Sequence, residues 1–128
     1  MMDETKIVEL LGQTLSGVKN IKNEELVFST TDGHQYRFFH DQDCCEHVYI
    51  VDIIGNLDDL VGQPLLMAEE NNSDKHPDDL KRGPDEYAPE SFSWTFYKFA
   101  TVKGYVTVRW LGESNGYYSE RVDFAKDW

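Results

Sequence analysis

The stretch that decides the fold is Ser91-Phe-Ser-Trp-Thr-Phe-Tyr-Lys-Phe99, in which aromatic residues alternate between two faces. A two-residue period is that of a β-strand. A turn at Thr101-Val-Lys-Gly104 leads into a second run of the same kind, Tyr105-Val-Thr-Val-Arg-Trp110. Asn115-Gly116, a strong signal for a hairpin turn, leads into a third, Tyr117-Tyr-Ser-Glu-Arg-Val-Asp-Phe124. We therefore expect three consecutive antiparallel strands in the C-terminal third.

Shorter runs rich in β-branched or aromatic residues precede these strands. They are separated by Gly, Asp and Asn turns, of which Thr31-Asp-Gly-His34 is the clearest hairpin signal. The runs are Thr14 to Val18, Glu25 to Thr30, Gln35 to His40, the more apolar His47 to Ile54, and Pro64 to Ala68. Short strands that follow one another in this way favour an antiparallel sheet.

Helical signals are confined to two short segments. Lys6-Ile-Val-Glu-Leu-Leu-Gly12 spaces its apolar residues for one face of a helix and ends in glycine. Leu57-Asp-Asp-Leu-Val61 is long enough for one helical turn. The sequence therefore predicts an α+β fold and a single domain over residues 1–128. The domain would consist of one twisted, mainly antiparallel β-sheet, an N-terminal helix packed on it, and a long acidic loop.

The charge of the chain limits its partners. Its 128 residues hold 12 Lys and Arg against 24 Asp and Glu, a net charge of −12, while 40% are hydrophobic and 13% aromatic. The apolar share is enough for a core, and the charge disfavours nucleic-acid polymers and anionic membranes as partners. No apolar run approaches the roughly 20 residues of a membrane span. The acidic N-terminus lacks a signal core, which indicates a cytoplasmic protein.

The composition changes abruptly from Glu69 to Glu90. Eight acidic residues accompany three basic ones there, and three of the four prolines fall in this stretch. Few large apolar groups are available to bury. Such a composition is typical of a disordered loop or a functional lid, and disorder is the favoured interpretation.

The segment His40-Asp-Gln-Asp-Cys-Cys-Glu-His47 is dense in residues that bind metals or perform catalysis. The adjacent Cys44 and Cys45 cannot form an ordinary disulfide with each other, which favours a reducing compartment. They match no standard zinc spacing, and the surrounding carboxylates disfavour the thiolate of a Cys–His nucleophile pair. We expect one buried thiol, turn hydrogen bonds from Asp41 and Asp43, and no bound metal, cofactor or catalytic residue.

The aromatic strands also carry arginines. Nucleobases stack on aromatic rings, and Arg grips phosphates through paired charged hydrogen bonds. In an acidic protein such a cluster favours a small phosphorylated nucleotide over a polymer. The candidate ligand contacts are Phe96, Arg109, Asn115, Tyr117 and Arg121. Composition alone favours the alternative, in which the aromatic side chains fill the core and the arginines pair with surplus carboxylates.

Three stretches carry a family resemblance. They are His40 to Glu46 with Val48 to Leu60, then Ala68-Glu-Glu70, and finally Trp94 to Trp110 with Gly112 to Phe124. Together they resemble a family of small proteins of unknown function that tailed phages and prophages encode. The sequence also looks like the Thoeris anti-defence sponge proteins, with which phages sequester the signals made by bacterial TIR immune enzymes.

The second resemblance implies a non-enzymatic binder of glycocyclic ADP-ribose, and in some members of cyclic oligonucleotides, acting in the host cytoplasm. It also implies self-association, as dimers that assemble into a hexamer with pockets between subunits. Arg109, in Val108-Arg-Trp-Leu-Gly112, is the one residue carried over as a ligand contact. Glu113 stands where some relatives offer a basic residue, which disfavours cyclic oligonucleotides.

Two other classes of function stay open. A protein-binding inhibitor could mimic nucleic acid through its charge, with the Glu69–Glu90 segment as its interaction surface. A metal-dependent hydrolase could be centred on His40, Cys44 and His47.

Overall fold

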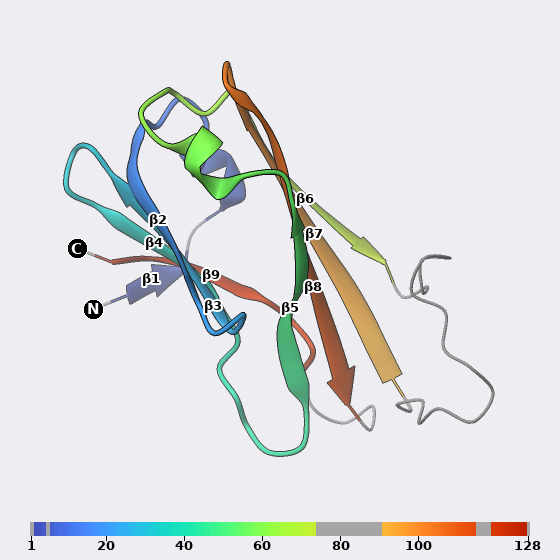
Figure 1. Cartoon of the computed structure of the whole chain (residues 1–128). Helices are drawn as coiled ribbons and strands as arrows, with labels where there is room; N and C mark the ends of the chain where they lie inside the picture. Colours follow the sequence, from blue (N-terminus) through green and yellow to red (C-terminus); the bar gives the residue numbers. More distant parts are fainter. Residues whose placement is uncertain (1, 5, 74–90, 115–118, 128) are drawn as a thin grey trace.

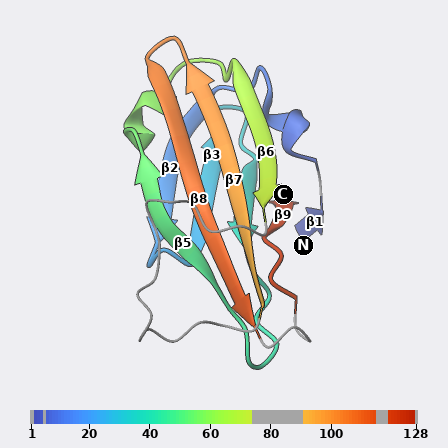
Figure 2. The same ribbon diagram turned by 90° about the vertical axis from the view of Figure 1, so that its right-hand side faces the viewer.

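The chain forms two antiparallel β-sheets that pack face to face in the computed structural model (Figure 1). The structure describes residues 2–4, 6–73, 91–114 and 119–127. The five-stranded sheet has the order β1 (Met2–Glu4), β9 (Asp123–Asp127), β4 (Gln35–Phe39), β3 (Glu25–Thr30) and β2 (Leu15–Ile21). The four-stranded sheet, seen face-on in Figure 2, has the order β5 (His47–Ile54), β8 (Gly104–Ser114), β7 (Ser91–Thr101) and β6 (Met67–Ser73).

The predicted hairpin of β7 and β8 is confirmed, and its ladder is the longest among the described strands. Its register runs from the pair Ser91 and Ser114 to the pair Thr101 and Gly104. The alternation of side chains is also as expected, because Tyr97 is fully buried between the sheets while the next residue, Lys98, is exposed. A hydrophobic inner face therefore follows directly from the two-residue period of the sequence.

The core joins the two sheets through aromatic contacts. Phe38 on β4 lies 4.7 Å from Tyr97 on β7 and 4.5 Å from Phe124 on β9, measured between ring centroids. Phe28 on β3 lies 5.0 Å from Phe99 on β7. These tilted and edge-to-face arrangements are the ones that aromatic rings prefer.

The predicted α+β class is wrong, because the molecule is an almost entirely β structure. The expected N-terminal helix is a four-residue 3-10 turn, η1 (Ile7–Leu10), of which only Leu10 is buried. Such a segment is too short to repay the cost of starting an α-helix. The expected single turn at Leu57 is confirmed as η2 (Leu57–Leu60).

The expectation of a single sheet is also wrong, since the last strand does not continue the aromatic meander. β9 pairs with β1 and β4, not with β8. Residues 119–122 lead across to the other sheet, and Glu120 accepts hydrogen bonds from Ser93 at 2.7 Å and Ser114 at 2.6 Å. Periodicity reveals which residues point inward, but not which sheet a strand joins.

The acidic loop predicted from Glu69 to Glu90 also has a different first residue in the structure. Glu69 to Ser73 belong to β6, which pairs with β7 and begins at Met67 instead of Pro64. The remainder of the predicted loop, residues 74–90, lies outside the described residues. Across the described ranges, no helix is long and apolar enough to cross a membrane.

Candidate functional site

Two of the five predicted ligand contacts come together on the outer face of the four-stranded sheet. Phe96 on β7 and Arg109 on β8 are direct cross-strand partners. The ring of Phe96 is half-buried and lies parallel to that of Trp94, with 5.9 Å between centroids and 4° between planes. The register therefore brings Phe96 and Arg109 to neighbouring positions, and their role as ligand contacts stays a prediction.

Arg109 is held in place by Asp52 of β5. Its Nε donates to Oδ1 at 2.6 Å, and a second guanidinium nitrogen donates to Oδ2. The arginine side chain is 12% exposed and the aspartate side chain 38%. A two-point pair of this kind is the same recognition that a phosphate would use. The carboxylate therefore fixes the guanidinium and competes with any anionic ligand for it.

The other three predicted contacts do not join this pair. Arg121 lies in the segment before β9, and its side chain is 66% exposed, with Nε 3.5 Å from Asp123. It therefore belongs to the five-stranded side of the sandwich, whereas Arg109 faces outward from the four-stranded sheet. Asn115 and Tyr117 lie outside the described residues.

Glu46, which sequence reasoning did not single out, organises the segment between β4 and β5. Its carboxylate is fully buried and accepts hydrogen bonds from the backbone N–H groups of Asp43 at 3.0 Å and Cys44 at 2.9 Å. The side chains of Gln42, at 3.2 Å, and His40, at 2.8 Å, complete the set. We call Glu46 and these four donors the Glu46 hub. Nothing in the sequence distinguishes this carboxylate from the other 23.

His40 connects the Glu46 hub to the segment that leads into β9. Its Nε2 contacts the Glu46 carboxylate, and its Nδ1 lies 2.8 Å from the backbone carbonyl oxygen of Arg121. Both ring nitrogens thus lie within hydrogen-bond distance of a partner, and the imidazole bridges the two segments. His40 thus serves to tie two loops together, which leaves neither nitrogen for a metal or a substrate.

The Glu46 hub should make the fold sensitive to acid. Burial opposes ionisation of Glu46, but the hydrogen bonds from His40, Cys44 and Asp43 outweigh it and lower the pKa from 4.5 to about 2. A depressed pKa in the folded state adds stability above the unfolded value, and this stability is lost as the pH falls from 4.5 towards 2. Urea unfolding between pH 6 and pH 2.5 should show this loss. Glu46→Gln should be less stable at pH 6 and should lose less over the same range, and equal slopes for both proteins would contradict the assignment.

Both cysteines are exposed and joined to each other by a disulfide. The expectation of one buried thiol is therefore wrong. The sequence argument excluded only an ordinary disulfide between the two residues, and since the structure joins them, the inference of a reducing compartment loses its support. His47 takes no part in the hydrogen bonds of the Glu46 hub and stacks on Tyr49 with 4.2 Å between ring centroids. Within the described ranges, no group of three His, Cys, Asp or Glu side chains is arranged to hold a metal ion.

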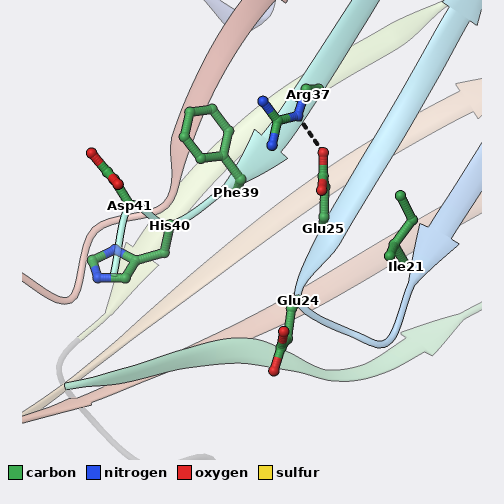
Figure 3. A pocket seen from close by; sticks show the side chains of 7 residues that line it. All are labelled: Ile21, Glu24, Glu25, Arg37, Phe39, His40 and Asp41. Carbon is green, nitrogen blue, oxygen red and sulfur yellow. Dashed lines mark hydrogen bonds and ion pairs between the residues drawn. The ribbon is translucent and has the colours of Figure 1, made fainter. Parts of the chain in front are cut away.

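A depression of about 490 Å³ lies on the outer face of the five-stranded sheet (Figure 3). Phe39 forms part of its lining and carries the guanidinium of Arg37 4.5 Å above its ring. Arg37 in turn pairs with Glu25, and Glu24 and Asp41 add two more carboxylates. This excess of negative charge disfavours an anionic ligand.

The fold and these contacts define a two-sheet β-sandwich with an aromatic–arginine face on one sheet and an acidic depression on the other. The chain belongs to the family described as a domain of unknown function, DUF7448, whose model matches residues 8–124. No curated protein and no solved structure matches it. Membership of this family agrees with the resemblance to proteins of unknown function, and it brings no link to phages or to sponge proteins.

Proposed function

We propose that the protein binds and retains a small phosphorylated nucleotide without cleaving it. The observation that carries the proposal is the direct pairing of Arg109 and Phe96 on one outer face. Phe96 would offer a surface on which a base stacks, and Arg109 a fork for a phosphate. Retention needs no general acid or base, so a site without catalytic groups is sufficient.

Ligand binding at Arg109 requires an exchange of partners. The carboxylate of Asp52 is paired with the guanidinium of Arg109, and a ligand phosphate would have to displace this carboxylate. A phosphate or pyrophosphate offers the guanidinium the same two-point hydrogen bonding as the carboxylate, and stacking of its base adds to the binding energy. For signals near micromolar concentration, retention needs a dissociation constant of about nanomolar order, or about −12 kcal/mol.

The finer form of the proposal follows the resemblance to Thoeris anti-defence sponges. In that form the ligand is a glycocyclic ADP-ribose signal, and the protein is encoded by a phage and acts in the host cytoplasm. Self-association into dimers or a hexamer would place a second subunit opposite the outer sheet face that carries Arg109. The ligand would then be enclosed between subunits, since a flat sheet surface by itself encloses little of a ligand.

The proposal is tested by capture and release with two opposite substitutions. Arg109→Ala should weaken retention by about 10- to 100-fold, because a charged hydrogen-bond pair is lost. Asp52→Asn should strengthen it by about tenfold, because the competing carboxylate loses its charge. Protein is incubated with extracts of cells that make TIR-derived signals, spin-filtered, and heated to release the ligand for mass spectrometry.

Arg37→Ala provides the matched control for this test. Arg37 also pairs with a carboxylate and contacts an aromatic ring, but on the other sheet. Its replacement should leave retention unchanged. Normal nucleotide retention by a folded Arg109→Ala variant would show that Arg109 does not form the binding site. Recovery of a cleaved nucleotide would show that the protein is an enzyme.

A second candidate function, a protein-binding inhibitor, is favoured by the acidic depression and the net charge of −12. Because Glu69 to Ser73 form part of β6, the informative deletion covers residues 74–90 only. Loss of activity on that deletion, with nucleotide retention intact, would favour a protein partner. A sponge should keep its activity.

A further inference from the structure

The exposed Cys44–Cys45 disulfide has no role in the proposed nucleotide site. It lies in the segment between β4 and β5, whose conformation the Glu46 hub fixes through internal hydrogen bonds and which His40 links to the backbone of Arg121. We propose that this disulfide is a reversible redox site that exchanges with a dithiol reductant while the protein stays folded. This inference is independent of the nucleotide-binding proposal.

The segment between β4 and β5 should keep its conformation whether the two cysteines are oxidised or reduced. Each donor of the Glu46 hub is a backbone N–H or the side chain of His40 or Gln42, so no sulfur atom takes part. The disulfide also joins neighbouring residues, and closing so short a loop removes little entropy from the unfolded chain. Reduction should therefore leave the free energy of unfolding almost unchanged.

The exchange itself takes two balanced steps. A thiolate of the reductant attacks one sulfur, forms a mixed disulfide and displaces the other cysteine thiolate, which takes up a proton. The second thiol of the reductant then attacks the mixed disulfide, releasing the second cysteine and leaving the reductant as a disulfide. Two electrons and two protons pass to Cys44 and Cys45, and the reverse exchange with the oxidised reductant restores the bond.

Charge selects the class of reductant. Asp41 and Asp43 flank the cysteines and are exposed, and the whole chain carries a net charge of −12. The attacking thiolate of glutathione carries more negative charge than the thiolate of a neutral dithiol, so it meets the stronger repulsion, which salt screens. The site therefore favours a neutral or basic dithiol over the anionic monothiol.

The experiment counts thiols on the folded full-length protein by alkylation and intact mass. Oxidised protein should take up no alkyl group, protein treated with dithiothreitol should take up two, and removal of dithiothreitol followed by addition of the neutral disulfide 2-hydroxyethyl disulfide should return the count to zero. The Tm should move by no more than about 2 °C between the states. Alkylation without reductant, or reduction only when urea unfolds the protein, would overturn the proposal.

The choice of reductant is tested by salt and by charge. Raising NaCl from about 0.02 to 0.5 M should speed reduction by glutathione about threefold or more, and it should speed reduction by dithiothreitol less, because the attacking thiolate of dithiothreitol carries less negative charge. The double variant Asp41→Asn with Asp43→Asn should reproduce the effect of salt, since the hub uses only the backbone of Asp43. Cys44→Ser is the matched control and should take up one alkyl group with or without reductant. Equal salt effects on both reductants would overturn the charge selection.

Discussion

Phe38→Ala is expected to lower the free energy of unfolding by about 3 to 5 kcal/mol and the Tm by roughly 10 to 20 °C. Phe38 is fully buried, and its ring contacts those of Phe28, Tyr97, Phe99 and Phe124. Removing it leaves a cavity at the place where the two sheets meet, and the surrounding rings cannot all move in to fill it. Urea denaturation at neutral pH measures the loss.

The matched control is the neighbouring residue, Phe39, which points out of the sandwich. Its ring is half-buried under Arg37 at the acidic depression. Phe39→Ala should cost about 1 kcal/mol, because it removes one cation–π contact and partial burial but leaves no closed cavity. If both substitutions cost the same, the assignment of inner and outer faces on β4 would be wrong.

Gly55→Ala should destabilise the protein by more than about 3 kcal/mol. Gly55 follows β5 with φ of 106°, a left-handed conformation that L-residues adopt at a cost. A Cβ at this position would also lie 2.4 Å from the backbone carbonyl oxygen of Tyr105 and 3.3 Å from Cα of Val106. Because both atoms belong to the backbone of β8, the ladder between β5 and β8 would have to shift.

Gly33→Ala separates the cost of the left-handed backbone conformation from the cost of the collision with the backbone of β8. Gly33 has a comparable φ of 93°, but a Cβ there meets no atom within 4 Å. Its replacement should therefore cost only the left-handed strain, about 1 to 2 kcal/mol. The difference between the two midpoints of urea unfolding measures the collision at Tyr105, and equal midpoints would show that the close approach is relieved without cost.

The strands were predictable from the sequence where a two-residue period is supported by a strong turn. β7 and β8 satisfy both conditions, and Thr31-Asp-Gly-His34 similarly joins β3 and β4. The sheet assignment of β9 was not predictable, because it depends on contacts between residues far apart in the chain. The N-terminal segment was wrongly predicted to be an α-helix because apolar residues at i, i+3 and i+4 fit one 3-10 turn as well as the start of an α-helix.

The candidate site was predictable only in part. The pairing of Phe96 with Arg109 follows from strand alternation once the hairpin is known. The role of Asp52 does not, since a bulge between Ile50 and Asp52 shifts β5 relative to β8. The Glu46 hub was missed because its donors include two backbone N–H groups, which leave no trace in the side-chain pattern.

The position of β9 bears on how the protein is made. β9 lies between β1 and β4, yet it is synthesised after every other strand described. On the ribosome, the nascent chain therefore presents β4 with an open edge, and β1 has no partner, until β9 has emerged. An unpaired edge is where chains pair wrongly with one another. Completion of the five-stranded sheet thus waits until β9 has left the ribosome, and until then the open edge exposes the nascent chain to aggregation and to chaperones.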